Sequence, residues 1–373
     1  MFTRRAVTLM LASAPLSACA EAPTISARPT FRQPDADLVP RANAGWRSWV
    51  EGFRGRAAGQ GIRSDIFDAA FRGQGFVPGV VARDRNQTEF RRSFEDYLNI
   101  VASEDRVEAG RAAFAANRAT LEAIEARYGV PAQIVAAIWG VESRFGARRG
   151  DIPVISATST LAFDGRRGEF FEAQVVAALR ILQSGDTTTD RMIGSWAGAM
   201  GHTQFIPTSY LQSAVDFDGD GRRDIWSDDP TDALASAAAY LRDAGWQRGG
   251  AWADEDPNGN LKPDPVGPAF RTGPNFRVIK RYNNSDSYAL GVGYLAHRIA
   301  GRGPLQAEFG PDRYGLRKTQ RVELQRKLTA AGFDTQGDDG VIGPNTRRAI
   351  EAFQRSRGLT VTGDPSVALL DAL

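Results

Sequence analysis

Apolar residues recur at helical spacing through most of the first 245 positions of the chain. The segments with this spacing, after an opening helix at Trp46, include 104–127, 131–145, 169–184 and 231–244. Gly, Pro, Asn and Asp crowd into 248–275, which predicts a long loop with at most short strands. Alternation at 276–279 predicts a short strand, and helical spacing returns at 288–299. The pattern therefore predicts a mainly α (α+β) protein.

The segment 131–145 is the most apolar of these helices. It follows Tyr128-Gly129-Val130-Pro131, where a glycine ends one helix and a proline suits the start of the next. Val135, Ile138, Glu142 and Phe145 are three, four and three residues apart, which places Glu142 on the buried stripe. Burial disfavours a carboxylate charge, so we expect a raised pKa for Glu142 and a role as proton donor. The alternative is a structural glutamate paired with an arginine or with backbone groups.

Small residues dominate the run from Ser195 to Pro207, Ser-Trp-Ala-Gly-Ala-Met-Gly-His-Thr-Gln-Phe-Ile-Pro. Small side chains let backbone approach a ligand closely, and the Gln204 amide offers both a donor and an acceptor to a sugar. Tight helix packing is the alternative interpretation. Taken together with Glu142 as a proton donor, this run is better interpreted as part of a sugar-binding cleft.

The segment from Asp216 to Asp224 matches the opening of an EF-hand loop, with acidic residues at positions 1, 3, 5 and 9 and glycine at position 6. Position 12, usually glutamate, is Ser227, so Asp228, Asp229 or Asp232 would have to close a longer loop. We predict a structural Ca²⁺ site, the alternative being a carboxylate-rich turn without metal. The candidate ligands are Asp216, Asp218, Asp220, Arg222, Asp224 and Asp232.

The composition narrows the chemistry. Two histidines and one cysteine in 373 residues support neither a zinc site nor a cysteine–histidine dyad. The sequence contains no phosphate-binding glycine motif, and its net charge of +2 is too balanced to indicate a nucleic acid as partner. Carboxylates remain as the acid–base candidates, and we expect no cofactor for the chemistry itself.

The first 19 residues have the pattern of an export signal, with Arg4 and Arg5 before a short apolar run. The run ends in Leu-Ser-Ala-Cys, where Cys19 matches the lipidated cysteine of bacterial lipoproteins. We therefore expect a lipid anchor on the periplasmic face of the outer membrane, with residues 20–43 as a flexible tether. Cleavage without lipidation would give a free periplasmic protein.

Residues 316–373 form a separate pattern of short helices around a turn at Gly337–Pro344. This segment resembles the three-helix peptidoglycan-binding domain. The residues that carry the resemblance are Leu324-Gln325, Asp339-Gly340, Gly343, Thr346, Phe353-Gln354, Gly358-Leu359 and Gly363. The glycines and prolines of 301–315 predict a linker crossed by few contacts, so we expect this module to bind wall independently.

Residues 44–308 resemble the lytic murein transglycosylase B family. The resemblance rests on Glu142-Ser143, the Ala-Gly-Ala-Met-Gly run with Gln204, the aspartate loop, and Tyr282-Asn283 with Tyr288. It implies a lysozyme-like domain with Glu142 as the sole catalytic carboxylate. Trp196 and His202 depart from the family pattern. The positions that the resemblance assigns to the glycan cleft are Tyr97, Ser195, Met200, Gln204, Tyr240, Tyr282, Asn283 and Tyr288.

The resemblance also implies the reaction. Such enzymes cleave the β-1,4 bond between N-acetylmuramic acid and N-acetylglucosamine without water and leave a 1,6-anhydro ring. A muramidase that adds water and a non-catalytic wall-binding lipoprotein are the alternatives. The partners expected are peptidoglycan strands, with the membrane reached through the lipid anchor and no nucleotide bound.

Overall fold

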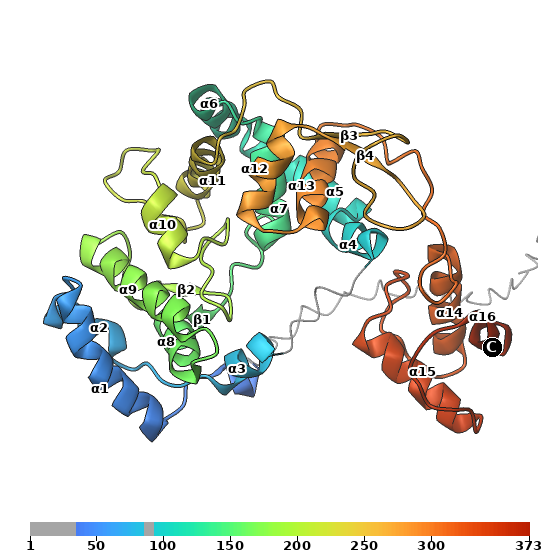
Figure 1. Cartoon of the computed structure of the whole chain (residues 1–373), viewed down its shortest axis with the longest axis horizontal. Helices are drawn as coiled ribbons and strands as arrows, with labels where there is room; N and C mark the ends of the chain where they lie inside the picture. Colours follow the sequence, from blue (N-terminus) through green and yellow to red (C-terminus); the bar gives the residue numbers. More distant parts are fainter. Residues whose placement is uncertain (1–34, 86–92) are drawn as a thin grey trace, which may run out of the picture. The chain divides into compact units, whose positions relative to one another are not determined.

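A computed structural model of the chain describes residues 35–85 and 93–373, and within these ranges the protein is mainly helical (Figure 1). The predictions for the export signal, for Cys19 and for most of the tether lie outside the described residues. The first helices are η1 (Ala36–Leu38), α1 (Ala44–Gly59), α2 (Ser64–Phe71), α3 (Pro78–Arg85), α4 (Phe94–Val101), α5 (Glu104–Ala116), α6 (Arg118–Tyr128), α7 (Ala132–Ser143), α8 (Val154–Asp164) and α9 (Gly168–Ser184). The later ones are α10 (Pro207–Ser213), α11 (Thr231–Asp243), α12 (Pro274–Tyr282), α13 (Asp286–Ile299), α14 (Lys318–Ala330), α15 (Pro344–Ser356) and α16 (Val367–Asp371).

The strands are short and pair in two antiparallel ladders. They are β1 (Ile152–Pro153) with β2 (Ile193–Gly194), and β3 (Ala253–Glu255) with β4 (Phe270–Thr272). The second ladder lies within the predicted long loop, as expected. The mainly α prediction is therefore confirmed, with the described strands confined to two short two-stranded pairs.

Most predicted helices begin and end close to their expected positions. The segment 104–127 is divided at Asn117, whose side-chain amide donates to the Ala113 carbonyl and separates α5 from α6. The N-cap residue of α11 is Pro230, which offers no side-chain cap, and Asp229 Oδ1 accepts from the Thr231 amide at 2.9 Å instead.

The strand predicted at 276–279 is wrong, because these residues lie inside helix α12. Four residues of this helix are buried, namely Asn275, Phe276, Val278 and Ile279. They include neighbouring positions, as one face of a helix does and as strict alternation along a strand does not. Pro274 occupies the first turn, where its missing amide hydrogen is harmless.

Two large apolar cores, with a smaller cluster around α3 and α8, support the larger part of the chain. One is built by α4–α7 and α11–α13, and the other by α1, α2, α8–α10 and the segment around Met200 and Phe205. Tyr240 and Tyr282 pack against both cores. The boundary between the cores therefore passes through residues that the sequence assigned to the glycan cleft.

Helix α7 lies inside the first core and packs against α5, α6, α11 and α13. Every residue from Ile134 to Gly140 is buried. Each fully buried aliphatic side chain of this kind contributes about 1.5–3 kcal/mol, so α7 is held by tertiary packing.

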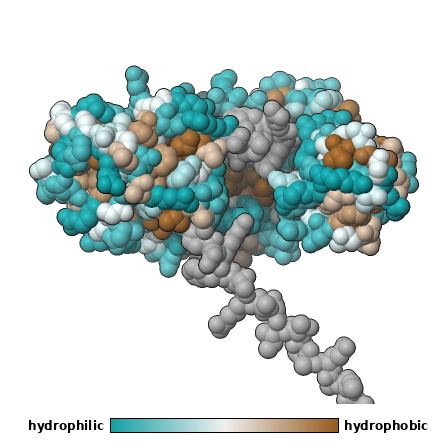
Figure 2. Space-filling view, turned by 90° about the horizontal axis from the view of Figure 1, so that it is seen from below, coloured by the Kyte–Doolittle hydropathy of each residue, from teal (hydrophilic) through white to brown (hydrophobic). Residues whose placement is uncertain are grey.

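The surface is mixed. The face shown in Figure 2 is mostly hydrophilic, with apolar residues in small separate areas. In the part of the chain that the structure describes, no helix has the length and apolarity of a membrane span.

Helices α14–α16 form a small three-helix module with its own core. That core consists of Leu316, Leu324, Leu328, Ala349, Ile350, Phe353, Leu369 and Leu370. Gln325 joins its helix to the turn, accepting from the Gly340 amide at 2.7 Å and donating to Thr346 Oγ1 at 3.1 Å. The Asp339-Gly340 turn and Thr346 are therefore held by one amide side chain.

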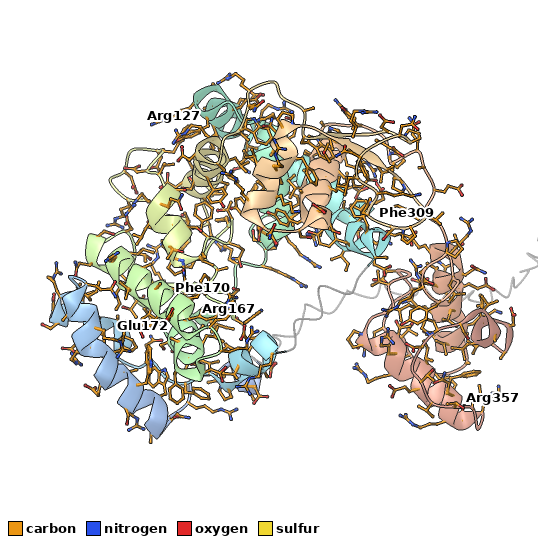
Figure 3. All side chains as sticks on the ribbon, viewed as in Figure 1. Arg127, Arg167, Phe170, Glu172, Phe309 and Arg357 are labelled. Carbon is orange, nitrogen blue, oxygen red and sulfur yellow. The ribbon has the colours of Figure 1, made fainter. Side chains whose placement is uncertain are left out.

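The segment before this module makes more contacts than the sequence predicted. Phe309 packs against Phe94 of α4 with ring centroids 6.1 Å apart, and it is labelled in Figure 3. The buried Arg321 of α14 forms ion pairs with Glu95 at 2.6 Å and Asp96 at 3.2 Å, both on α4. The expectation that few contacts cross 301–315 is therefore not met, because a buried arginine requires carboxylate partners that the module itself supplies incompletely.

Candidate functional site

Glu142 lies in the last turn of α7, where the helix is forced to end. Arg144 and Phe145 both have left-handed backbone, with φ of 53° and 56°. Gly140 permits this turn, because a Cβ at that position would overlap the Phe145 ring. Of the four non-glycine residues with positive φ in the described ranges, these two and Gln204 lie around Glu142. Backbone strain is concentrated where a side chain must be aimed precisely.

Tyr288 of α13 holds Glu142 directly. Its hydroxyl donates to Glu142 Oε1 at 2.6 Å, a short bond typical of a hydroxyl on a carboxylate. Glu142 itself is half-buried. Burial, followed by the Glu142 charge, raises the pKa of Tyr288 well above its usual value. The phenol therefore stays protonated and acts as a donor.

A row of tyrosines continues from Tyr288. The Tyr282 ring stacks on Tyr288 at 6.3 Å, and the Tyr240 ring meets Tyr282 edge-on at 5.1 Å. Tyr282 Oη donates to the Thr203 carbonyl at 2.7 Å, and burial raises its pKa as well. Phe205 packs against both Tyr240 and Tyr282, a role that the sequence did not reveal.

The small-residue run forms a tight turn opposite these tyrosines. The Ser195 amide donates to the Ala199 carbonyl at 2.7 Å, and the Ala199 amide donates back to Ser195 Oγ at 3.1 Å. Gln204 Nε2 donates to the carbonyls of Gly201 at 2.8 Å and Arg149 at 3.1 Å. Its amide orientation is thereby fixed, and within the described ranges no donor reaches its Oε1.

The remaining predicted cleft residues differ in exposure. Met200 has no exposed surface and belongs to the second core, so its side chain supports the turn from behind. The ring of Tyr97, on α4, packs closely against Gly291 of α13. A Cβ at position 291 would lie 2.6 Å from that ring, so glycine is what permits the contact. Asn283 is exposed at the end of α12, where its carbonyl accepts from the Ser285 amide at 2.7 Å.

The aspartate loop joins α10 to α11 (Figure 1). Carboxylate oxygens of Asp216, Asp218 and Asp220 lie within 4.8 Å of one another. Asp216 accepts from the Gly219 amide at 2.7 Å and the Gly221 amide at 2.9 Å, which folds the loop around its own carboxylates. Three hard oxygen donors at this separation suit a calcium ion.

The other candidate ligands have different partners. Arg222 donates its amide to Asp220 Oδ1 at 2.8 Å, and Asp224 Oδ2 pairs with Arg191 at 3.2 Å. Asp232 is buried and accepts from the amides of Phe217 at 2.7 Å and Asp224 at 2.9 Å. Burial raises its pKa to about 6. Asp232 thus holds both ends of the loop.

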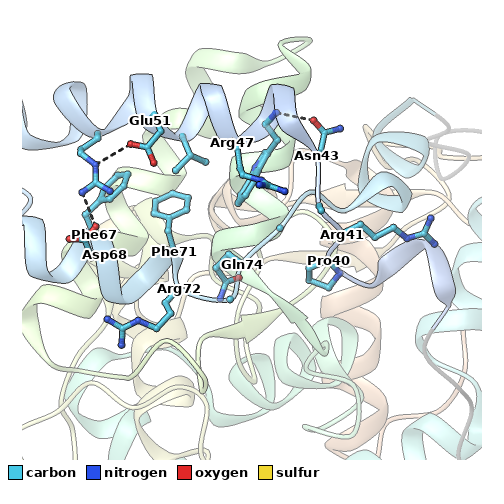
Figure 4. A pocket seen from close by; sticks show the side chains of 16 residues that line it. Pro40, Arg41, Asn43, Arg47, Glu51, Phe67, Asp68, Phe71, Arg72 and Gln74 are labelled. Atoms are coloured by element: carbon cyan, nitrogen blue, oxygen red, sulfur yellow. Dashed lines mark hydrogen bonds and ion pairs between the residues drawn. The ribbon is translucent and has the colours of Figure 1, made fainter.

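Two surface hollows lie elsewhere on the larger part of the chain. One, of about 660 Å³, adjoins the end of α7 and is lined by Arg148, Arg149, Arg191 and Trp226 among others. The other, of about 570 Å³, lies by α1 and α2 (Figure 4). Within its lining, Arg54 pairs with Asp68 at 2.8 Å.

The geometry thus brings together a half-buried carboxylate at the end of a core helix, a row of tyrosines and a glycine-rich turn. Two family models match the chain. "Transglycosylase SLT domain" covers residues 45–262 and 253–297, and "Putative peptidoglycan binding domain" covers 317–373. The first match spans more than half of the chain and contains the site described above.

Individual relatives agree with these matches. The membrane-bound lytic murein transglycosylase B of Escherichia coli (strain K12) is 34% identical over 212 residues, an alignment that covers 46% of this chain and 58% of the relative's length. SltB3 from Pseudomonas aeruginosa, solved with NAG-NAM-pentapeptide, is 43% identical with a TM-score of 0.68. That match covers 88% of this chain and 100% of SltB3, which has also been solved with NAG-anhNAM-pentapeptide.

A third relative is the Escherichia coli lytic transglycosylase Slt35 in complex with calcium. It is 25% identical, with a TM-score of 0.56, over 71% of this chain and 97% of Slt35. The chain belongs to the lytic transglycosylase family of the SltB and membrane-bound B type, with a C-terminal peptidoglycan-binding domain. The resemblance drawn from the sequence is confirmed.

Proposed function

We propose that the protein is a lytic transglycosylase that cleaves the β-1,4 bond between N-acetylmuramic acid and N-acetylglucosamine in peptidoglycan. The observation that carries the proposal is the Glu142 carboxyl, aimed by Tyr288 at 2.6 Å into a site lined by tyrosines. The SltB3 complexes with NAG-NAM-pentapeptide and NAG-anhNAM-pentapeptide support it, because the second ligand is the 1,6-anhydro form.

Glu142 first acts as general acid. Negative charge is unfavourable near the C-terminal end of a helix, where α7 places this side chain. Its proton passes to the glycosidic oxygen as the bond to C1 breaks, and positive charge develops on the muramyl ring. The carboxylate that results is stabilised by the Tyr288 hydroxyl.

Glu142 then acts as general base. The carboxylate removes the proton of the muramyl C6 hydroxyl while that oxygen bonds to C1 and closes the 1,6-anhydro ring. The Glu142 proton is thereby restored and no water is consumed. Hydrolysis of the usual kind needs a second carboxylate across the bond. Intramolecular attack replaces it with a high effective molarity.

Gln204 and the tyrosines orient the glycan in this proposal. The fixed Gln204 amide presents Oε1 to an N-acetyl or hydroxyl donor, since its Nε2 is already engaged by two carbonyls. Tyr240, Tyr282 and Ser195 line the same site, while Tyr97 and Asn283 extend it along α4 and α12. Met200 contributes through the turn that it supports.

The aspartate loop binds calcium in this proposal. Its donor set fits a hard cation, and the related Slt35 has been solved with calcium. The ion's role is structural: Asp216, Asp218 and Asp220 would hold it, while Asp232 fixes the loop backbone. Added calcium should raise the thermal unfolding temperature of the wild type and leave that of Asp218→Ala unchanged. Equal responses of the two proteins would remove calcium from the proposal.

The cellular site follows from the N-terminal pattern and the family. A peptidoglycan substrate and an export signal place the enzyme in the periplasm, and Cys19 would attach it to the outer membrane by lipid. Globomycin-sensitive lipid labelling of the wild type, lost in Cys19→Ser, is the expected result. Absence of lipid label on the wild type would favour a free periplasmic enzyme.

The catalytic proposal is tested by mass spectrometry of fragments released from purified sacculi. Wild type should release fragments one water lighter than hydrolysis products, and Glu142→Gln should lose this activity by several orders of magnitude while remaining folded. Glu122→Gln is the matched control, because Glu122 lies on the exposed face of α6. Products of hydrolytic mass would favour the muramidase, and glycan binding without cleavage by wild type would favour the non-catalytic lipoprotein.

A further inference from the structure

His202 is one of two histidines in the chain and is buried beside the end of α7. The Trp139 indole Nε1–H donates to His202 Nδ1 at 3.0 Å, and the two rings meet edge-on with centroids 5.7 Å apart. On the other side, His202 Nε2 lies 2.7 Å from the Ser227 carbonyl oxygen. Both ring nitrogens are therefore engaged, one by α7 and one by the segment after the aspartate loop.

These partners determine the protonation of the ring. An indole N–H can only donate, so Nδ1 must be the acceptor, and a carbonyl can only accept, so the proton lies on Nε2. The Arg149 guanidinium lies 3.3 Å from Nε2, and its positive charge also disfavours an imidazolium. The site thus selects a neutral imidazole with one defined tautomer.

The backbone of His202 makes a second connection to α7. Ser143 Oγ–H donates to the His202 carbonyl at 2.6 Å, and Ser143 Oγ accepts from the Gly146 amide at 3.0 Å. Ser143 directly follows Glu142 and precedes the left-handed turn that ends the helix. His202 consequently fixes two residues, Trp139 and Ser143, that flank the Glu142 turn.

Arg149 also binds the segment 226–228. It donates to the carbonyls of Trp226 at 2.9 Å and Ser227 at 2.6 Å, and it pairs with Asp228 at 2.7 Å. Its own carbonyl accepts from Gln204. The His202 network, which consists of Trp139, Ser143, Arg149, His202 and Ser227, therefore joins the ends of three segments that meet at the site.

We propose that His202 is a positioning residue for the reaction and orients Glu142 through Trp139 and Ser143. This inference rests on the proposed function of Glu142. The neutral ring ties α7 to the segment 225–228, so the last helical turn cannot rotate away from Tyr288. A proton on Nδ1 would place two donors face to face and release the helix end.

The chain contains a matched control for this inference. Trp252 Nε1–H donates to His297 Nε2 at 3.1 Å, with ring centroids 4.9 Å apart. This second tryptophan–histidine pair joins the 248–275 loop to α13 and contacts neither Glu142 nor Ser143. Removing it has a similar structural cost without the proposed positioning effect.

The experiment compares His202→Leu, His202→Gln, Trp139→Phe and His297→Leu in the full chain. Turnover is measured on a soluble NAG-NAM-peptide oligomer, together with thermal unfolding. His202→Leu and Trp139→Phe should lower kcat by about 10- to 100-fold with little change in KM, because a misplaced catalytic group slows the bound substrate. His202→Gln keeps one acceptor and one donor, and we expect it to recover most of kcat. His297→Leu should leave kcat within about twofold of wild type.

A spectroscopic readout separates positioning from general stability. Nitrogen NMR of the wild type should show the His202 ring proton on Nε2, and the Trp139 indole signal should shift in His202→Leu and much less in His202→Gln. An Nδ1-protonated ring, an unshifted indole signal, equal kcat losses in His202→Leu and His297→Leu, or a loss confined to KM would each overturn the inference. Hydrolytic products from wild type would refute transglycosylation instead, while the kcat comparison would still report how the acid is positioned.

Discussion

Replacing Arg321 by Met tests whether the peptidoglycan-binding module is coupled to the larger domain. The guanidinium is 1% exposed and pairs with Glu95, Asp96 and Asp312, which are 12%, 21% and 11% exposed. Methionine fills a similar volume but leaves these three carboxylates without their cation. Removing one partner of a buried ion pair costs about 3–5 kcal/mol. At roughly 2 °C per kcal/mol for a unit of this size, the unfolding temperature should fall by about 6–10 °C.

The same helix supplies the control. Arg326 pairs with Asp338 at the surface, with side chains 70% and 47% exposed, and such pairs contribute about 0–1 kcal/mol. Arg326→Met should therefore shift the unfolding temperature by no more than about 2 °C. Differential scanning calorimetry of both variants, in the full chain at the same pH and salt, makes the comparison.

Glu95→Gln isolates the contact with α4. It leaves the bonds from Arg321 to the Gly340 and Leu316 carbonyls intact, so a loss of stability in this variant comes from the pairing across 301–315. Because Glu95 is two residues from Tyr97, turnover of soluble substrate should also fall. If Arg321→Met and Arg326→Met unfold within 1 °C of each other, the reasoning about the buried cluster is refuted and the module is independent.

Three further predictions concern the site. Tyr288→Phe removes a charge-assisted bond to Glu142 worth about 1.5–3 kcal/mol, so kcat should fall about 10- to 100-fold, and a change below twofold would contradict this role. Gly140→Ala should lower stability by about 1–3 kcal/mol in calorimetry through overlap with a phenylalanine ring, whereas Gly55→Ala, in open space on α1, should not destabilise the protein. Burial, partly opposed by a carbonyl hydrogen bond, lowers the pKa of His202 in the folded protein below 6.5. The unfolded chain therefore binds a proton at a higher pH than the folded protein does. Stability that is present above pH 6.5 is lost as the pH falls towards the lower pKa of the folded state. Thermal unfolding at pH 7.5 and 5.5 should show a smaller loss for His202→Gln than for wild type, and equal losses would contradict the assignment.

Periodicity located most of the helices because burial of one face repeats along the chain. Helix α7 was predicted at 131–145 and is observed at Ala132–Ser143, since its apolar stripe and its flanking proline and glycine are local signals. The strand predicted from alternating apolar and polar residues at 276–279 was wrong, because a run of four residues does not distinguish a strand from one face of a helix. Helix α8 was missed because its buried face is rich in hydroxyls, such as Ser159, which accepts from the Trp46 indole.

The residues of the candidate site also fall into two groups, those indicated by local motifs and those known only from their tertiary contacts. Motif spacing identified Glu142, Gln204 and the aspartate loop, because those residue types are required by the chemistry whatever surrounds them. Phe205 and Arg149 carried no such signal. Their roles depend on which rings and carbonyls they meet, and these partners lie 30 to 80 positions away in the chain.

The sequence by itself therefore determined the helical class and the order of the modules, and it singled out Glu142 as the candidate acid, because each is encoded by neighbours within a few turns of chain. Tertiary structure decided which donor holds Glu142, how Asp232 is used and what Arg321 pairs with. A carboxylate or guanidinium needs a counter-group once it is buried, but its sequence position does not say which one. The partner is chosen by the packing of helices such as α4, α7, α13 and α14, and it is fixed when they come together.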